Sequence, residues 1–404
     1  MKPGVAPRAA ARRIVTRVLR SGAYSNLVVR GETRDLAQDD ARLAQRLGYD
    51  TIRNLLRIDR TIDSVSTRPL TAIGDEVLDT IRVGVNELLF TGTADHAAVD
   101  SAVEVARSIE PGASGFCNAI LRAVIRPGEP EFPEGDQGGA LRLGQPLWIY
   151  EQMLSAWGED EAATFLAASQ LEAPRTARLR WGEAPDGALP VSGISSAYLL
   201  PPQAVLPEGM VVQDGASIAV SLALDPQPAE VILDLAAAPG GKALHIADLL
   251  DGSGVVIASD RHSRRVTSAV GRLEESPVRW CVADGRRTPY RSDSFNRVLV
   301  DAPCSGLGTL RRRPEVRFRT TQADLTNLAA VQVDMLAEAL RVVRPGGLVV
   351  YSVCTVTPQE TINVIEGLHT EPLTGLPGRP WGGGWLLAPH LTGTDGMFIT
   401  RIRA

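Results

Sequence analysis

The sequence has 404 residues, 44% of them apolar, and a formal net charge of −5, which suits a globular protein of two or three domains. No apolar run approaches the length of a membrane span, and the basic N-terminus lacks the apolar core of a signal peptide, so we expect a cytoplasmic protein. The four cysteines show no CxxC spacing, which argues against a zinc site or a disulfide framework and favours reduced thiols.

Residues 1–126 are predicted to be helical throughout. Apolar residues recur at helical spacing, as in the stripe of Ile14, Val15, Val18 and Leu19, and strand signals are lacking. Although the chain is acidic overall, residues 1–60 hold thirteen Lys or Arg against six Asp or Glu. Such a local basic excess is typical of a surface that binds nucleic acid.

Residues 127–140 form a Pro/Gly-rich acidic connector, which predicts a linker. Residues 141–210 mix two expected helices with one expected strand and are assigned to a small module. From residue 211 to 404 strands and helices alternate, which predicts an α/β domain with a doubly wound sheet. Its first helix follows the sequence VVQDGAS, where Ser217 could act as the N-cap. Strands are expected near 230–235, 255–260, 278–284, 297–302, 348–354 and 396–403.

The segment 231–242, VILDLAAAPGGK, reads as a buried strand, a tight turn and a helix start. Its proline and two glycines let the backbone approach a ligand at the carboxyl end of a parallel strand. The segment does not match GxGxxG, so a dinucleotide is disfavoured. Asp260 and Asp284 end the next two expected strands, where carboxylates could meet a ribose and an adenine. The pattern therefore suits a nucleoside cofactor without a pyrophosphate.

Two cysteines complete the predicted crevice. Cys304 follows a strand in RVLVDAPCSG, and Cys354 ends another in LVVYSVCTVTP, so both thiols should point into the same crevice. Of 42 basic residues only Lys2 and Lys242 are lysine, and Lys242 stands where the turn meets the crevice. A compact ammonium, rather than a planar guanidinium, fits what such a site would require.

These motifs together, DLAAAPGGK, SDRH, VADG, DAPCSG and YSVCTVTPQE, resemble the RNA cytosine-C5 methyltransferases of the Sun type, in particular the RsmB/Fmu family that modifies 16S rRNA. The resemblance covers nearly the whole chain. It implies a Rossmann-like class I methyltransferase domain, with an antiparallel edge strand at its end, preceded by a NusB-like domain. It also implies RNA binding by the segment from Arg8 to Arg20 and by the module at 141–210, and a monomer.

The resemblance also implies the reaction and its residues. A cysteine thiolate adds to C6 of cytosine, and C5 can then take the methyl group of S-adenosylmethionine. Cys354 would be the nucleophile and Cys304 the residue that helps release the product. DNA cytosine methyltransferases attack from the proline-cysteine motif, so Cys304 as nucleophile is the competing assignment. Asp301 would contact the target base or the methionine end of the cofactor, with Lys242 close to it.

The remaining implied contacts concern cofactor and RNA. The methionine portion would lie against Ala237, Ala238, Pro239, Gly240 and Gly241, with Asp260 at the ribose and Asp284 at the adenine. Ala243 stands where the family commonly has threonine, which removes a possible hydroxyl contact with the cofactor. RNA phosphates would be bound by Arg311, Arg312, Arg313 and Arg317. Two alternatives stay open: the same chemistry on tRNA, and a non-catalytic RNA-binding factor for ribosome assembly.

Overall fold

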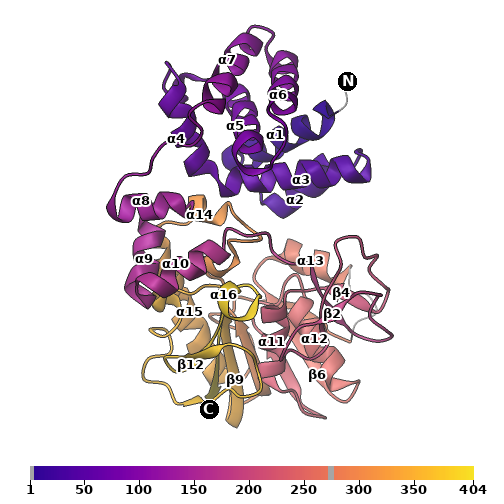
Figure 1. Cartoon of the computed structure of the whole chain (residues 1–404). Helices are drawn as coiled ribbons and strands as arrows, with labels where there is room; N and C mark the ends of the chain where they lie inside the picture. The colour runs from indigo at the N-terminus through magenta and orange to yellow at the C-terminus, as the bar shows by residue number, and fades with distance from the viewer. Residues whose placement is uncertain (1–3, 272–276) are drawn as a thin grey trace. The chain divides into compact units, whose positions relative to one another are not determined.

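The computed structural model describes residues 4–271 and 277–404, and the chain divides into two compact units (Figure 1). The helical unit comprises Met1–Gln170 and Arg312–Arg319, and the sheet unit comprises Leu171–Arg311 and Thr320–Ala404. The division therefore differs from the predicted boundaries. The first 30 residues of the predicted module at 141–210 fall in the helical unit, and so do eight residues from within the predicted α/β domain.

The helical unit contains no strand among its described residues, as predicted. Ile14, Val15 and Val18 of the predicted apolar stripe are buried against Leu47 and Ile52 in one core cluster. The predicted linker at 127–140 already contains the start of a helix, α8. The elements are α1 (Val5–Arg20), α2 (Ser25–Glu32), α3 (Gln38–Arg53), α4 (Leu55–Val65), η1 (Leu70–Ala72), α5 (Asp75–Phe90), α6 (Asp95–Ile109), α7 (Ala113–Ile125), α8 (Gly135–Arg142), α9 (Leu147–Trp157), α10 (Glu159–Ala168) and α14 (Val316–Arg319).

The sheet unit is built on a nine-stranded sheet with the order β11-β12-β13-β9-β8-β5-β6-β7, in which β10 also pairs with β13. The strands from β5 to β9 run parallel to one another, which confirms the predicted doubly wound sheet. Their bounds are β5 (Val231–Asp234), β6 (Val255–Asp260), β7 (Arg279–Val282), β8 (Phe295–Asp301), β9 (Val343–Val353), β10 (Thr370–Glu371), β11 (Arg379–Trp381), β12 (Gly384–Leu387) and β13 (Met397–Arg403).

The last strand differs in one respect from the expectation. β13 is antiparallel to β9 as predicted, but it does not form the edge of the sheet. The segment before it folds into the hairpin of β11 and β12, and β12 pairs with the free side of β13. The edge prediction is therefore wrong, because a short glycine-rich segment supplies two more strands.

Both faces of the sheet are covered. Along β9, Leu348 and Val350 belong to the core cluster that contains residues of α11 (Gly215–Leu224) and α12 (Gly241–Leu250). The alternate residues Val349 and Tyr351 belong to the cluster that contains residues of α15 (Gln322–Val342). Burial on both sides explains why the strand reads as one continuous apolar run. The other short helices of the unit are α13 (Ser263–Val270), η2 (Leu307–Thr309), η3 (Pro358–Glu360) and α16 (Pro389–Thr392).

A four-stranded antiparallel sheet precedes α11, with the order β2-β3-β1-β4. Its strands are β1 (Thr176–Leu179), β2 (Leu189–Pro190), β3 (Ala197–Leu199) and β4 (Met210–Val212). The N-cap of α11 is Asp214, whose carboxylate accepts a hydrogen bond from the Ala216 N–H at 2.9 Å. The predicted cap Ser217 lies inside the helix, so that assignment is wrong. Within the described ranges, no helix combines the length and apolar content that a membrane span needs.

Candidate active site

The two predicted cysteines meet at the carboxyl edge of the parallel sheet. β8 and β9 are neighbours, and their register pairs Asp301 with Ser352. The two strands therefore end side by side, and each is followed within three residues by a cysteine. The Sγ atoms of Cys304 and Cys354 lie 3.2 Å apart, and both side chains are partly buried. Two thiols at this distance can act on the same atom of a substrate, or on neighbouring atoms.

Glycines let the two cysteine loops approach this closely. The Gly308 N–H donates a hydrogen bond to the Cys354 carbonyl at 3.0 Å, and the Gly396 N–H donates one to the Gly308 carbonyl at 2.8 Å. A Cβ at Gly308 would lie 2.1 Å from the Gly396 carbonyl oxygen. It would also lie 2.9 Å from the Cys354 carbonyl oxygen, so a side chain at position 308 would force the two cysteine loops apart.

An ion pair lies beside the thiols. The Lys242 Nζ donates to the Asp301 Oδ2 at 2.6 Å, and the Ser352 hydroxyl donates to the Asp301 Oδ1 at 2.9 Å. Burial lowers the pKa of Lys242, but the Asp301 carboxylate and, more weakly, a negative charge on Cys354 outweigh it, so the pKa is raised overall. The ammonium is therefore firmly protonated.

The groups around Cys304 oppose a negative charge on its sulfur. Its hydrogen bond with Cys354, its burial, and the negative charges of Cys354 and Glu360 raise the pKa of Cys304 well above the usual value. At neutral pH Cys304 is therefore a thiol. The structure thus places a protonated Cys304 against Cys354, with the positive charge of Lys242 near the latter.

Asp234 is a site residue that sequence reasoning missed. It ends β5 and is 1% exposed. No side chain of the described residues donates a hydrogen bond to its carboxylate, and the Ala236 N–H is the backbone group that interacts with it. Burial and the nearby Asp301 carboxylate raise the pKa of Asp234 to about 7, against the opposing effect of Lys242. The sequence signal that could have identified Asp234 is its position as the acidic residue at the end of the apolar run VILD. A buried carboxyl group of this kind suits a cationic ligand.

The Asp234 pKa predicts a pH dependence of stability. Because the carboxyl binds its proton more tightly in the folded chain, ionisation destabilises the sheet unit as pH rises from about 4 to 7. Over that range the free energy of unfolding of the wild type should fall relative to Asp234→Asn, by on the order of 4 kcal/mol. Thermal unfolding of both proteins between pH 4.5 and 8, without cofactor, measures the difference. Parallel stability curves would contradict the raised pKa.

The predicted glycine loop has the geometry of a ligand-binding loop. It follows β5, and the Ala237 N–H donates to the Ser259 carbonyl on β6 at 2.9 Å. Gly240 has φ +105°, which favours glycine, and Gly241 begins α12. A Cβ built at Gly241 would meet only the Gln213 side chain, at 3.9 Å, so this stretch of backbone is open. A hollow of about 190 Å³ borders Pro239 on the side of α13.

Asp260 ends β6, and Asp284 comes two residues after the end of the neighbouring strand β7, at the same edge of the sheet. The Asp260 side chain is 3% exposed, accepts from the His262 N–H at 2.9 Å, and pairs with Arg265 at 3.1 Å. The hydrogen bond and charge of Arg286 lower the pKa of Asp284 to about 2. Both lie where the sequence predicted carboxylates for a nucleoside. Together with Asp234 and the open glycine loop, these residues fit a cofactor that joins a nucleoside to a cationic amino acid.

The arginine-rich segment after Cys304 is not the exposed basic surface that the sequence predicted. Arg317 is 1% exposed in the helical unit, where it donates to the carbonyls of Arg53 and Gly144 and to the Gln170 Oε1 at 2.8 to 3.2 Å. Arg311 is 6% exposed and donates to the Gly393 carbonyl at 2.6 Å. The predicted phosphate contacts of these two residues are therefore wrong. Arg312 is half-buried, and Arg313 is exposed.

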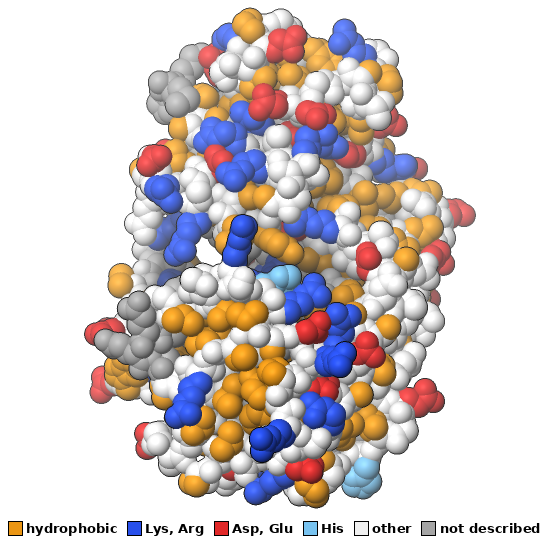
Figure 2. Space-filling model, turned by 180° about the vertical axis from the view of Figure 1, so that it is seen from behind, with side chains coloured by type: hydrophobic (Ala, Val, Ile, Leu, Met, Phe, Trp, Pro, Cys, Tyr) orange, Lys and Arg blue, Asp and Glu red, His pale blue; other side chains and the backbone are white. Residues whose placement is uncertain are grey.

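The basic segment of α1 is partly neutralised in a similar way. Each of its five arginines forms an ion pair with a carboxylate of α2 or α5: Arg8 with Glu87, Arg12 with Glu76, Arg13 and Arg17 with Glu32, and Arg20 with Asp75. Blue and red side chains are correspondingly intermingled on the face shown in Figure 2. The ion pairs reduce the positive charge of α1 but do not cancel it, because Arg13 and Arg17 share the single carboxylate of Glu32 and both stay about half exposed. Other exposed arginines nearby include Arg30 in the last turn of α2, Arg34 just after that helix, and Arg46 on α3.

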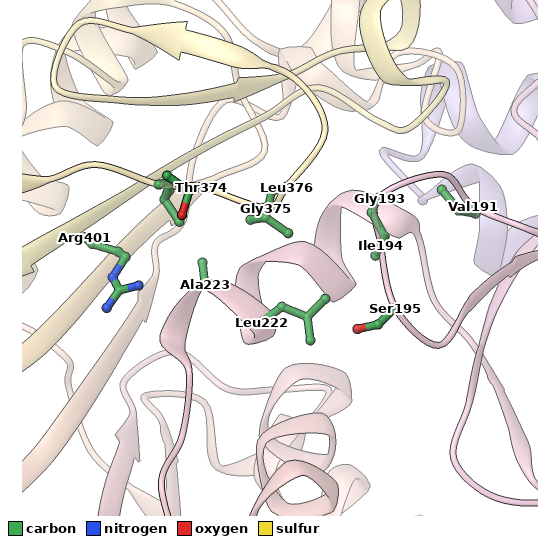
Figure 3. A pocket seen from close by; sticks show the side chains of 11 residues that line it. Val191, Gly193, Ile194, Ser195, Leu222, Ala223, Thr374, Gly375, Leu376 and Arg401 are labelled. Atoms are coloured by element: carbon green, nitrogen blue, oxygen red, sulfur yellow. The ribbon is translucent and has the colours of Figure 1, made fainter.

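Another pocket of the sheet unit lies away from this edge and is lined by no predicted site residue. It has a volume of about 540 Å³ and lies between the C-terminal half of α11, the loop at 191–195 and the segment at 373–376 (Figure 3). Leu222 and Ala223 face Thr374, Gly375 and Leu376 across it. The chemistry-bearing side chains gather at the carboxyl edge of the sheet, so we assign the site there.

Comparisons with known proteins agree with this geometry. A family model described as 16S rRNA methyltransferase RsmB/F matches residues 221–403, and the NusB family model matches residues 5–126. The ribosomal RNA small subunit methyltransferase B of Salmonella paratyphi B is 30% identical over 98% of each chain. A putative methyltransferase of Mycobacterium tuberculosis is 32% identical over 94% of this chain and 93% of its own. The crystal structure of PH0851 has a TM-score of 0.83 and 23% identity, covering 98% of this chain and 99% of that one.

The sheet, its topology and the family match define the sheet unit as a Rossmann-like methyltransferase domain, preceded by a NusB-type helical domain. Both predictions of fold are thereby confirmed. The chain belongs to the RsmB/F family of methyltransferases.

Proposed function

We propose that this protein methylates carbon 5 of a cytosine in ribosomal RNA of the small subunit, with S-adenosylmethionine as the methyl donor. The observation that carries the proposal is the pair of sulfur atoms 3.2 Å apart at the carboxyl ends of β8 and β9, beside the Lys242–Asp301 ion pair. Methylation at C5 of cytosine needs a nucleophile at C6 and a second group that acts at C5, and adjacent thiols supply both.

Cys354 is the proposed nucleophile. The Lys242 ammonium nearby favours a thiolate at this sulfur, whereas the pKa of Cys304 is raised and keeps that residue a thiol. Attack by the Cys354 thiolate forms an S–C6 bond and breaks the 5,6 double bond, which moves an electron pair to C5. The positive charge of Lys242 near Cys354, and its counterpart, the raised pKa of Cys304, favour Cys354 as nucleophile over the competing assignment of Cys304.

Release reverses the addition. After methylation, C5 carries both a methyl group and its original hydrogen. Once the thiol proton of Cys304 has passed to solvent water, its thiolate can accept the proton from C5; the electron pair of the C–H bond re-forms the 5,6 double bond, the S–C6 bond breaks, and the Cys354 thiolate leaves. The proton given to water corresponds to the hydrogen that the methyl group replaces, and the neutral thioether of the methyl donor is the leaving group of the transfer. Cys304 then returns to its thiol form, so protons and electrons balance over the cycle.

The residues proposed to bind the cofactor lie along the carboxyl edge of the parallel sheet. S-adenosylmethionine, when bound, supplies an electrophilic methyl group on a sulfonium. Asp234 would bind the ammonium of its methionine portion, with Ala237, Ala238, Pro239, Gly240 and Gly241 along the same portion. Asp260 would accept from the ribose hydroxyls and Asp284 would lie at the adenine. The burial of Asp234 and the open backbone at Gly241 support this assignment.

RNA as substrate is supported by the family and by relatives named as ribosomal RNA small subunit methyltransferases. Phosphate contacts are proposed for Arg312 and Arg313, the two predicted arginines that remain at least partly exposed. The target base has to leave its stack before the cysteines can reach C6.

The test is to trap the covalent adduct. Cys304→Ala protein is incubated with unmethylated small-subunit rRNA and S-adenosylmethionine and then run on a denaturing gel. We expect a slow protein–RNA band that persists because release is blocked, and that is absent from Cys304→Ala/Cys354→Ala. A band with Cys354→Ala instead would exchange the two roles.

Two parallel samples separate the alternatives. Transfer RNA in place of rRNA tests the tRNA substrate, since a band with tRNA alone would overturn the rRNA proposal. No band and no methyl transfer with either RNA, from a protein that still binds RNA, would favour a non-catalytic assembly factor.

A further inference from the structure

The carboxylate of Glu360 is the centre of a buried hydrogen-bond cluster that joins the two cysteine loops. Glu360 ends η3, six residues after Cys354, and is 0% exposed. Its Oε1 accepts from the Ser305 N–H at 2.8 Å and from the Gln332 Nε2 at 3.1 Å. Its Oε2 accepts from three hydroxyl groups, those of Ser305, Thr355 and Thr357, at 2.5, 3.2 and 3.0 Å.

The partners of Glu360 are the residues that directly follow each cysteine. Ser305 comes after Cys304 and Thr355 after Cys354, and their hydroxyl groups also lie 2.8 Å from each other. Gln332 of α15 adds a bond to the Pro303 carbonyl, on the other side of Cys304, at 2.9 Å. One carboxylate thus ties the residue after Cys304 to the residue after Cys354, and Gln332 adds a bond to the backbone before Cys304.

The backbone of Glu360 is bound to a strand of the sheet. Its carbonyl accepts from the Tyr351 hydroxyl on β9 at 2.6 Å, and Tyr351 is completely buried. Each donor to the carboxylate found in the described part of the chain is a neutral group, so these bonds do not neutralise the negative charge close to the thiols. That charge contributes to the raised pKa of Cys304.

We propose that Glu360 is a positioning residue that fixes Cys304 against Cys354 and holds Cys304 in its thiol form. Its hydrogen bonds set the geometry, because they tie Ser305 and Thr355 to a single point. Its charge disfavours a second thiolate next to Cys354. The inference concerns the spacing and protonation of the two thiols, and its catalytic consequence rests on the proposed function.

The main experiment measures thiol chemistry and needs neither RNA nor cofactor. Wild type and Glu360→Gln are treated with iodoacetamide between pH 6 and 10, and alkylation of each cysteine is followed by mass spectrometry. Loss of the charge should increase the alkylation rate of Cys304 at pH 8 by roughly three- to tenfold, since one unit of pKa changes the thiolate fraction tenfold. Cys117, buried in the helical unit, serves as an internal reference.

The matched control is Glu338→Gln. Glu338 is also a buried glutamate of the sheet unit, but it accepts from Thr288 and Arg341 and contacts neither cysteine loop. Its replacement should leave the Cys304 profile unchanged. Glu360→Asp separates the two roles, because it keeps the charge but shortens the reach: the pH midpoint of Cys304 should stay while methyl transfer falls.

Kinetics give a second readout. In Glu360→Gln we expect kcat for methyl transfer to fall by roughly a hundredfold, as for a misplaced reacting group, with KM for S-adenosylmethionine within about twofold of wild type. If Glu360→Gln does not fold, Ser305→Ala and Thr355→Val remove single donors but keep the Glu360 charge. The pH midpoint of Cys304 should then stay while methyl transfer falls, as in Glu360→Asp, and a lowered midpoint in either variant would contradict the role of the charge.

Unchanged alkylation profiles in a folded Glu360→Gln protein would overturn the assignment. If the wild type itself transfers no methyl group to any RNA, the proposed function fails, but the alkylation profiles still decide the role of Glu360.

Discussion

Replacing Lys242 by methionine should slow formation of the protein–RNA adduct by on the order of a thousandfold, the upper end of the effect of removing one charge-stabilising group from an active site. The substitution removes the cation that pairs with Asp301 at 2.6 Å and that favours a thiolate at Cys354. Single-turnover adduct formation on Cys304→Ala background, with S-adenosylmethionine at saturation, measures the step directly.

The structure offers a matched control on β8, the strand that carries the Lys242 partner Asp301. Arg297 lies near the start of β8 and pairs with Glu230 at 2.6 Å, with both side chains about as buried as Lys242. Arg297→Met should reduce stability but leave the adduct rate of the folded protein within about twofold. Lys242→Arg should recover little, because a planar guanidinium does not fit the place of a compact ammonium. An equal loss in Lys242→Met and Arg297→Met would show that the effect is only structural.

Replacing Arg317 by methionine should destabilise the helical unit by on the order of 3 kcal/mol or more, because it leaves buried acceptors without donors. These acceptors are the carbonyls of Arg53 and Gly144 and the side-chain oxygen of Gln170. Hydrogen exchange followed by mass spectrometry should show faster exchange in α3, in the turn after α8, and in α14. Thermal unfolding gives the corresponding shift.

Arg313→Met is the control for that variant, since Arg313 lies four residues earlier and is exposed. Its stability should change by no more than about 0.5 kcal/mol, while RNA affinity and its salt dependence should decrease. If Arg317→Met left stability intact and weakened RNA binding instead, the buried arrangement of Arg317 would be refuted.

Local patterns in the sequence were sufficient for the sheet and for the edge that carries the site. An apolar run that ends in a polar residue marks a parallel strand and its carboxyl end, so Asp260, Asp301 and Cys354 could be placed from the sequence. Asp234 carries the same signal but was not recognised as a site residue. Neighbouring strands end at one edge, and this brings the predicted residues together. The Lys242–Asp301 pair likewise joins two residues that the sequence had already placed at the crevice.

Long-range pairing could not be predicted in this way. Arg8 looks like a surface charge until α5 brings Glu87 to it from 79 residues away. Arg317 stands in an arginine-rich run that is typical of an RNA-binding loop, yet its partners come from α3, the turn after α8 and the end of the helical unit. Glu360 follows a proline and a glutamine, and no spacing rule distinguishes it from an ordinary polar residue. In each case the partner is determined by packing and not by the local sequence.

The short segment Arg312–Arg319 limits how freely this protein can be divided or recombined. It belongs to the helical unit, but the chain enters and leaves it from the sheet unit, after the loop of Cys304 and before α15. A fragment that begins at Leu171 would keep these eight residues and lose the partners of Arg317 and Phe318. The two units are therefore not interchangeable modules, and a chimera that joins this methyltransferase domain to another helical domain needs a redesigned segment at 312–319.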